Sequence, residues 1–269
     1  MSLRKVALVT GGSAGLGACI ARVLAHELGT SVIINYSANA ERAEALVKEL
    51  RETAPATATG TDKDGAAPPA VFRAIQADLS RKADVTRLVN EAAAAAGGRL
   101  DVVVSNVGYT KMRNFYDLDD GLHEEDWDKC FTVNVKSHLW LFHAARRWLE
   151  ESNSRDPGAA VFVSTASVAG CKPSGSSLPY AVTKAAQIHL VKSLATIAAP
   201  SIRVNSVSPG ILLTEWGLSF PPDRLAAVEK QNKLQRFATI EDVAVQVKAF
   251  VASKSVTGQN AVIDAGFSL

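Results

Sequence analysis

Short runs of apolar and β-branched residues alternate along this chain with longer segments in which apolar residues recur at helical spacing. This alternation is typical of βαβ units, and it predicts parallel strands that helices bury on both faces. The expected strands lie at 6–10, 31–35, 71–76, 100–105, 160–164, 202–207 and 261–264. The expected helices lie at about 16–28, 40–53, 81–96, 124–151, 180–199 and 239–253. We therefore predict an α/β fold in three α/β/α layers, with a doubly wound seven-stranded parallel sheet of the Rossmann type.

Two segments interrupt the pattern. Residues 52–70 are rich in Ala, Thr, Gly and Pro without periodicity, which predicts a mobile surface insertion between a helix and the third strand. Residues 212–235 also lack clean periodicity, but they follow a strand end and contain Trp216 and Phe220. Loops in that position commonly cover a ligand, so we expect a substrate-covering loop there. One domain is expected to span residues 1–269.

Composition and charge exclude several classes of protein. Hydrophobic residues make up 47% of the chain and charged residues 21%, which is ordinary globular usage. The net charge of +2 provides no field to hold a polyanion, so nucleic acid is not an expected partner. The chain has no run of about 18 apolar residues, so no membrane segment is expected. The three cysteines are far apart and suit a reducing compartment, so we expect a cytoplasmic protein.

A glycine-rich stretch, TGGSAGLG at residues 10–17, joins the first expected strand to the first expected helix. Glycines allow the backbone to turn tightly and to approach a pyrophosphate, which the positive end of a helix dipole attracts. The spacing differs from the common G-x-G-x-x-G fingerprint. The context favours nucleotide binding, although a glycine-rich turn also serves as a simple tight connection.

The end of the second strand bears on which dinucleotide is preferred. An acidic residue there accepts a hydrogen bond from a free adenosine ribose hydroxyl, whereas this chain reads INYSAN at residues 34–39 and has no acid. Ser37 and Asn39 are neutral residues at the start of the next helix, and Arg42 lies one turn further on. These residues favour NADP(H) over NAD(H), while the alternative interpretation is that they only cap the helix.

Lys184 follows Tyr180 by four positions, in a stretch whose sequence predicts the start of a helix. On a helix they share one face, so the lysine ammonium can approach the tyrosine phenol. A nearby positive charge stabilises a phenolate and lowers the pKa of the tyrosine toward neutrality, where a general acid or base works best. The same spacing also suits an aromatic ring covered by a solvated lysine stem.

The joint pattern of several motifs decides between these readings. Their order and spacing closely resemble the short-chain dehydrogenase/reductase family over nearly the whole chain: TGxxxGxG at 10–17, SNVG at 105–108, Asn134, Ser167, YxxxK at 180–184 and Pro209-Gly210. The resemblance implies four catalytic residues. Tyr180 is similar to the family's proton donor, and Lys184 to the residue that binds the nicotinamide ribose. Ser167 would orient the substrate carbonyl, and the backbone of Asn134 would hold a water in the proton relay.

The resemblance also implies the residues that bind the dinucleotide. The turn residues Asn106 and Gly108 depart slightly from the family's Asn-Asn-Ala-Gly motif, because Ser105 and Val107 replace its first and third members. Thr214 matches the position that holds the nicotinamide amide. The full expected set is Gly11, Ser13, Gly15, Leu16, Gly17, Tyr36, Ser37, Asn39, Asp78, Leu79, Asn106, Gly108, Tyr180, Lys184, Pro209, Gly210 and Thr214.

The implied activity is NADP(H)-dependent reduction of a ketone carbonyl to an alcohol, or the reverse. The alternative is a non-catalytic NADP(H)-binding sensor or scaffold, or a non-redox biosynthetic enzyme of the same fold. No metal is expected, because the five histidines show no metal-binding spacing. Aromatic residues on segments near the expected pocket suggest an apolar or aromatic carbonyl substrate: Tyr109, Phe115, Trp216 and Phe220.

Two of the expected helices, 124–151 and 180–199, resemble those with which the family builds a subunit interface. The resemblance implies a homotetramer or a homodimer. Five apolar residues are candidates to line the interface, although aromatic residues at helical spacing are also common in a core: Trp127, Phe131, Leu139, Trp140 and Phe142.

Overall fold

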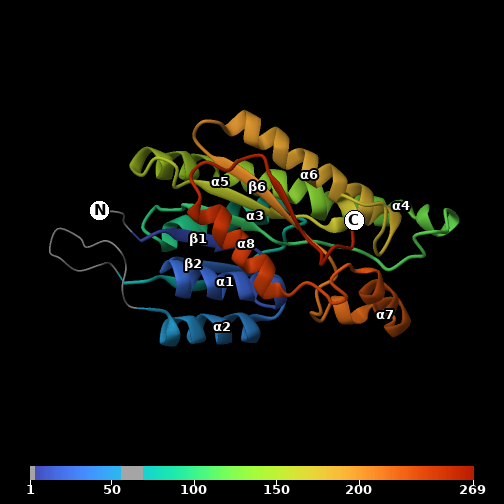
Figure 1. The fold of residues 1–269 in the computed structure, drawn as a ribbon. Helices are drawn as coiled ribbons and strands as arrows, with labels where there is room; N and C mark the ends of the chain where they lie inside the picture. The colour runs from blue at the N-terminus through green and yellow to red at the C-terminus, as the bar shows by residue number, and fades with distance from the viewer. Residues whose placement is uncertain (1–3, 56–68) are drawn as a thin grey trace.

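The computed structural model describes residues 4–55 and 69–269, and a parallel β-sheet lies at its centre (Figure 1). In the described residues the seven strands run in the order β3-β2-β1-β4-β5-β6-β7, and every neighbouring pair is parallel. The strands are β1 (Val6–Val9), β2 (Ser31–Tyr36), β3 (Phe72–Gln76), β4 (Val102–Ser105), β5 (Val161–Thr165), β6 (Arg203–Pro209) and β7 (Asn260–Ile263). The predicted doubly wound α/β fold is confirmed.

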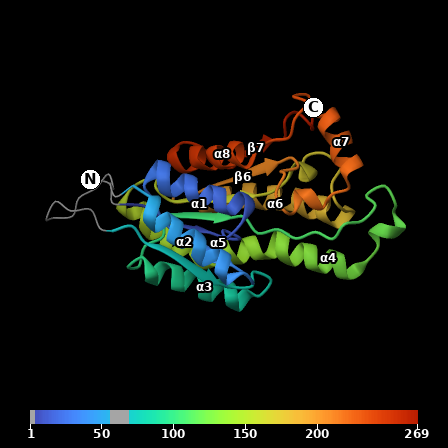
Figure 2. The same cartoon turned by 90° about the horizontal axis from the view of Figure 1, so that it is seen from below.

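Helices cover both faces of the sheet (Figures 1 and 2). One face packs against α1 (Gly15–Leu28), α2 (Ala40–Thr53) and α8 (Ile240–Ala252). The other packs against α3 (Lys82–Ala95), α5 (Ser137–Arg155) and α6 (Leu178–Ala198). The remaining α-helices are α4 (Glu124–Phe131) and α7 (Pro222–Gln231).

Each strand sends alternate side chains to the two faces, as the twofold repeat of a strand requires. In β1, Ala7 and Val9 join the apolar cluster formed with α1 and α8, whereas Val6 and Leu8 join the cluster on the opposite face. All four are almost fully buried. A strand covered on both sides has no solvent face, which is why its sequence is a continuous apolar run.

The order of the strands creates a crevice at the carboxyl edge of the sheet. From β1 the chain proceeds outward through β2 to β3, and it then returns to place β4 on the other side of β1. Connections therefore leave the ends of β1 and β4 in opposite directions, which is the position where doubly wound sheets bind ligands. The glycine-rich turn follows β1 and Asn106 follows β4, so the sequence motifs lie at this crevice.

Two helical regions differ from the sequence prediction. The expected helix at 124–151 is interrupted by a π-helical turn, η2 (Thr132–Lys136), between α4 and α5. The segment 212–235, in which we expected no helix, contains α7, and none of the side chains of α7 is buried. A helix without a buried apolar stripe leaves little periodic signal in the sequence. The core of the predicted insertion, residues 56–68, lies outside the described residues.

One of the five candidate interface residues belongs to the core. Phe142 is 4% exposed and packs edge-on against Phe162 of β5, with ring centroids 5.4 Å apart. The expectation that it lines a subunit surface is therefore wrong, because its position on α5 faces the sheet. Leu139, on the same helix, is 42% exposed.

A buried asparagine connects the crevice to the edge of the sheet. Asn35, at the end of β2, accepts a hydrogen bond from the backbone N–H of Gly11 through Oδ1, at 3.2 Å. Its Nδ2 donates to the carbonyls of Ile75 and Ala77 at 3.3 and 3.1 Å. The side chain is 2% exposed, so it satisfies polar backbone groups that water does not reach.

Replacement of Asn35 should lower the stability of the protein. We expect Asn35→Ala to lower the free energy of unfolding by about 2–3 kcal/mol, because it removes the acceptor of the buried Gly11 N–H and the donor to the carbonyls of Ile75 and Ala77. Urea denaturation measures the change. Asn90→Ala, at an exposed position of α3, is the control and should change the stability by less than about 0.5 kcal/mol. Equal effects of the two substitutions would contradict the assigned role of Asn35.

Candidate active site

The turn between β1 and α1 is tight enough to require glycine at several positions. Gly11 and Gly15 have φ angles of 59° and 48°, which side-chain-bearing residues rarely adopt. A Cβ on Gly17 would lie 2.2 Å from the Gly11 carbonyl oxygen. The first turn of α1 therefore packs directly on the preceding loop, and the N-cap residue Ala14 supplies no side-chain hydrogen bond. The unpaired amides and dipole of this helix start suit a pyrophosphate.

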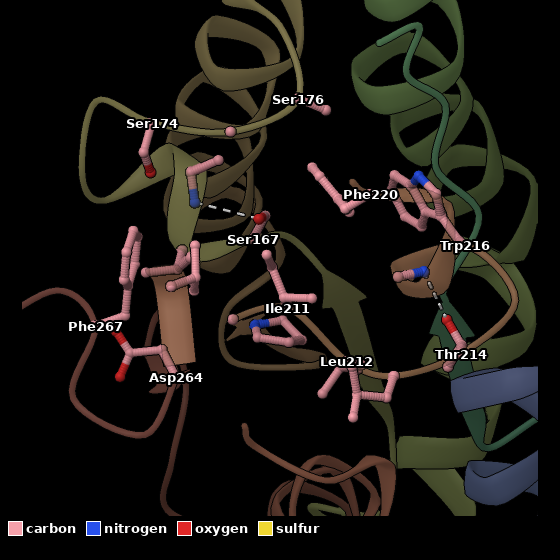
Figure 3. Close-up of a pocket in the computed structure, with 18 of the residues that line it drawn as sticks. Ser167, Ser174, Ser176, Ile211, Leu212, Thr214, Trp216, Phe220, Asp264 and Phe267 are labelled. Carbon is pink, nitrogen blue, oxygen red and sulfur yellow. Dashed lines mark hydrogen bonds between the residues drawn. The ribbon is translucent and has the colours of Figure 1, made fainter. Parts of the chain in front are cut away.

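A cavity of about 770 Å³ opens beside this turn. Its wall combines Gly15 and Gly17 with Asn106, with the segment after β5 and with the segment after β6. Figure 3 shows Ser167 on one side of the cavity and Trp216 and Phe220 on the other. Most of the surrounding side chains are apolar, including Phe115 and Phe267. The cavity can therefore hold an apolar molecule whose polar group faces Ser167.

A smaller cavity, of about 190 Å³, lies at the ends of β1 to β4. Gly11, Ser37, Asp78, Leu79 and Gly108 line it, together with Tyr109. Asp78 accepts hydrogen bonds from the backbone and side chain of Ser80, and these bonds lower the pKa of its carboxyl group. The size and position of this cavity suit the base and ribose at one end of a dinucleotide.

The start of α6 positions the tyrosine and the lysine. Ser177 caps the helix by accepting a hydrogen bond from the Tyr180 N–H, and Pro179 occupies the first turn. Tyr180 is 7% exposed and Lys184 is 2% exposed, one turn apart on the same face. The Lys184 Nζ lies 5.6 Å from the centre of the Tyr180 ring. Trp216 packs edge-on against the Tyr180 ring, with ring centroids 5.8 Å apart.

Ser167 and Tyr180 approach each other at the cavity wall. Ser167 caps the short helix η3 (Val168–Gly170), and its Oγ accepts a hydrogen bond from the Ala169 N–H at 3.2 Å. Burial raises the pKa of Tyr180, and a hydrogen bond with Ser167 offsets only part of that rise. Both residues line the large cavity, so one polar atom of a ligand can contact the serine hydroxyl and the phenol together.

Asn134 lies in the π-helical turn η2, and its side chain is fully engaged. Its Oδ1 accepts from the Tyr109 N–H at 2.7 Å, and its Nδ2 donates to the Tyr109 carbonyl and to the Thr183 hydroxyl at 2.9 and 3.0 Å. The turn after β4 passes close by, because a Cβ on Gly108 would lie 3.7 Å from Asn134 Oδ1 and 3.5 Å from Lys184 Nζ. The side chain of Asn134 thus ties three segments together.

The comparisons with known proteins agree with this geometry. A family model described as short chain dehydrogenase matches residues 5–224. This chain belongs to the short-chain dehydrogenase family. It is 32% identical over 270 residues to 3-oxoacyl-[acyl-carrier-protein] reductase FabG of Staphylococcus aureus, and the match covers 99% of both chains.

Solved structures of short-chain dehydrogenases share the fold over its full length. A short chain dehydrogenase from Burkholderia cenocepacia in complex with NADP has a TM-score of 0.82 and 32% identity, and the match covers 99% of both chains. The RhlG/NADP active-site complex of Pseudomonas aeruginosa has a TM-score of 0.83 and 27% identity, with 99% of this chain and 97% of that chain covered. The family binds a nicotinamide cofactor, and the glycine turn and paired cavities of this short-chain dehydrogenase fit one.

Most of the residues expected to bind the cofactor lie at the two cavities. Four of them, Ser13, Tyr36, Asn39 and Lys184, line neither cavity in the described part of the chain. Asn39 caps α2 by accepting from the Arg42 N–H at 2.9 Å, and Lys184 is buried behind Tyr180. Of the expected site residues, those that line the large cavity are Gly15, Leu16, Gly17, Asn106, Ser167, Tyr180, Pro209, Gly210 and Thr214. The residues that line the small cavity include Gly11, Ser37, Asp78, Leu79 and Gly108.

Two expectations need correction. Tyr109 lines the small cavity, and the Lys129 Nζ lies 4.3 Å from the centre of its ring. Phe115, Trp216 and Phe220 line the large cavity as expected.

The second correction concerns Tyr180, whose pKa is not lowered overall in this structure. Burial raises the pKa of Tyr180 to about 12, which outweighs the hydrogen bond from Ser167. The phenol is therefore protonated at neutral pH, as a proton donor must be.

Sequence reasoning missed the residues that hold the lysine. Lys184 Nζ donates to the Thr165 carbonyl at 3.0 Å and to Gln187 Oε1 at 2.9 Å. Burial lowers the pKa of Lys184 to about 7. The spacing of Gln187, three residues after Lys184, places it on the same helical face and was the available signal.

Two further classes of site are not found. Among residues 4–55 and 69–269, no group of three or more His, Cys, Asp and Glu side chains could hold a metal ion. None of the helices in the described segments is both long and apolar enough to cross a bilayer.

The contact between Gly17 and Gly11 yields a direct test of the cofactor site. We expect Gly17→Ala to weaken NADPH binding at least about tenfold, equivalent to about 1.4 kcal/mol, because its Cβ would displace the Gly11 carbonyl. Fluorescence titration measures the dissociation constant. Gly97→Ala is the control: its φ of 64° disfavours alanine, so this variant should lose some stability, but its added Cβ would meet nothing within 4 Å and NADPH affinity should not change. Unchanged affinity in Gly17→Ala would show that this turn does not contact the cofactor.

Proposed function

We propose that this chain is an NADP(H)-dependent oxidoreductase that reduces a ketone carbonyl to an alcohol, or catalyses the reverse reaction. The observation that carries the proposal is the buried phenol of Tyr180 beside Ser167, on the wall of a cavity that the glycine turn also lines. This arrangement puts a proton donor and a carbonyl-binding hydroxyl where a dinucleotide and a small molecule meet.

The cofactor would extend across both cavities. Gly15, Gly17 and Thr214 would hold the nicotinamide end and the pyrophosphate, and Asp78 with Gly108 would hold the adenosine end. When bound, the reduced cofactor supplies a hydride to the substrate. Lys184 Nζ lies 5.6 Å from the Tyr180 ring centre, close enough to share a ribose hydroxyl with the phenol.

Three side chains would perform the proton chemistry. The Ser167 hydroxyl donates a hydrogen bond to the substrate carbonyl oxygen and polarises it. The Tyr180 hydroxyl then protonates that oxygen as it gains negative charge. The Lys184 ammonium stabilises the phenolate that remains. Because the pKa of Lys184 is about 7, the fraction of the lysine that is charged changes with pH near neutrality. In the reverse direction Tyr180 accepts the alcohol proton.

Preference for NADP(H) is supported by charge at the end of β2. No acid follows the strand, and Arg42 lies one turn into α2. Its Nη1 contacts Glu215 at 3.0 Å, but the arginine side chain is 41% exposed and accessible to a phosphate. Two structural relatives are described as NADP complexes. We infer that Arg42 contributes to recognition of the adenosine phosphate.

The substrate is proposed to be an apolar or aromatic carbonyl compound. Phe115, Trp216, Phe220 and Phe267 line the large cavity, and they favour an apolar body next to the polar Ser167 and Tyr180. One relative is named for the reduction of a 3-oxoacyl group, which is also a ketone on an apolar chain.

The proposal includes a homodimer or homotetramer in the cytoplasm. Leu139 on α5 and Val182 on α6 are 42% and 40% exposed, which supports a contact between subunits on these helices. The thiols of Cys19, Cys130 and Cys171 are free, which supports a reducing compartment.

Removal of the phenolic hydroxyl tests the catalytic proposal. We expect Tyr180→Phe to lower kcat for carbonyl reduction by about 10²–10⁴-fold, because no other group would donate the proton. The decrease in NADPH absorbance with a panel of apolar ketones measures the rate. NADPH titration of the same variant provides the control for folding, since the ring that packs against Trp216 remains. Full activity in Tyr180→Phe, or no turnover by the wild type with any ketone, would count against the proposal.

Replacement of Arg42 tests the cofactor preference. We expect Arg42→Ala to raise the dissociation constant of NADPH by about 10–100-fold and to leave that of NADH unchanged, because only NADPH carries the additional phosphate. Glu215→Gln is the matched variant: it removes the competing carboxylate and should leave NADPH binding as tight or tighter. An equal loss of both cofactors in Arg42→Ala would remove the support for this assignment.

A further inference from the structure

A buried side-chain amide, that of Gln187, accepts a hydrogen bond from Lys184. Gln187 is 0% exposed and lies one helical turn beyond Lys184 on α6. Its Oε1 accepts a hydrogen bond from Lys184 Nζ at 2.9 Å. A neutral amide oxygen near a buried ammonium stabilises the charged form of the lysine.

The orientation of this amide is fixed by its other contacts. Gln187 Nε2 donates to Ser164 Oγ at 2.7 Å and to the Thr165 carbonyl at 3.0 Å. If the amide were flipped, its oxygen would face the Thr165 carbonyl and its NH₂ group would face the ammonium, so two favourable contacts would become repulsive. The acceptor atom must therefore point at Lys184.

A buried histidine completes the network. His138 Nε2 lies 3.1 Å from the Val107 carbonyl, which can only accept, so Nε2 carries the proton. Nδ1 is then an acceptor for the hydroxyls of Ser105 and Ser164, at 2.7 and 3.0 Å. Burial and the nearby Lys184 charge lower the pKa of His138 to about 3, so the ring is neutral.

The network therefore surrounds one positive charge with uncharged groups. The titratable groups that face Lys184 are Tyr180 on its own helix, Cys130 on α4 and His138 on α5. The strands β4 and β5 contribute Ser105, Ser164 and Thr165, which do not titrate. Burial raises the pKa of Cys130 to about 11, so its thiol is neutral as well.

We propose that Gln187 is a positioning residue for Lys184, held in orientation by Ser164 and His138, and that it keeps the ammonium charged and directed toward the turn at Gly108. The importance of Lys184 for the reaction rests on the proposed function, but the contact itself does not. Burial lowers the pKa of Lys184 to about 7, so loss of either of its two hydrogen bonds should change the fraction of the lysine that is charged near neutral pH.

Two substitutions of Gln187 should move the titration of Lys184 in opposite directions. Gln187→Met keeps the length of the side chain but removes the strong acceptor, so the pKa of Lys184 should fall by about one pH unit. Gln187→Glu retains an acceptor and adds negative charge, so the pKa should rise by at least about one pH unit. NMR titration of ¹³Cε-labelled lysine in the cofactor-free protein measures both values, with Lys184→Arg to assign the signal.

A packing change alone would not produce opposite shifts. Val191→Ala, a buried position one turn further along α6, is the control and should leave the Lys184 titration unchanged while lowering stability. If Gln187→Met does not fold, Gln187→Glu still decides. An unchanged or lowered pKa in Gln187→Glu would overturn the proposal, and so would shifts of the same sign in both variants.

The pH dependence of turnover provides a second test of the role of Gln187. The high-pH loss of kcat/KM should move to lower pH in Gln187→Met and to higher pH in Gln187→Glu, in parallel with the NMR values. If the wild type reduces no carbonyl compound, the proposed function fails, while the NMR titration still tests the role of Gln187. If turnover is normal and the NMR values do not move, the role of Gln187 fails alone.

Discussion

The arrangement of this protein depends on one ammonium group that is buried at the carboxyl edge of the sheet. Lys184 is 2% exposed, and one of the two groups that hold it comes from β5 while the other comes from its own helix. Burial of an isolated charge is strongly unfavourable, so its partners must be fixed before the charge can be accommodated. The carbonyl of Thr165 at the end of β5 and the amide of Gln187 meet this requirement. The parallel sheet therefore fixes the position of one of the two groups that hold the lysine.

The same edge gathers the other elements of the site. Parallel strands all end on one side, so the loops that follow β1, β4, β5 and β6 converge there. The contact between Gly17 and the Gly11 carbonyl brings α1 against its own loop, and Asn35 fastens that loop to the third strand. In the proposed function, cofactor binding, carbonyl binding and proton donation would therefore share one wall, assembled from the short segments that follow these strands.

Much of this architecture could be predicted from the sequence, since strands buried on both faces leave continuous apolar runs and glycine turns leave a recognisable spacing. Tyr180 and Lys184 could be paired because both lie on one helix. Contacts between distant segments left no comparable signal: nothing local links His138 to Ser164 or Arg42 to Glu215. The π-helical turn at Asn134 was not predicted, because residues 124–151 were interpreted as one continuous helix and a single turn with one additional residue is too short to leave a periodic signal of its own. The raised pKa of Tyr180 depends on burial, which only the folded chain defines.

The helix α7 borders the large cavity, yet none of its side chains is buried. Substitutions in α7 can alter the shape of the cavity without disturbing either apolar cluster of the sheet. The lining of the proposed substrate cavity and the stability of the sheet therefore depend on different residues. A different ligand preference could arise by exchange of residues in α7 at no cost to the scaffold or the glycine turn.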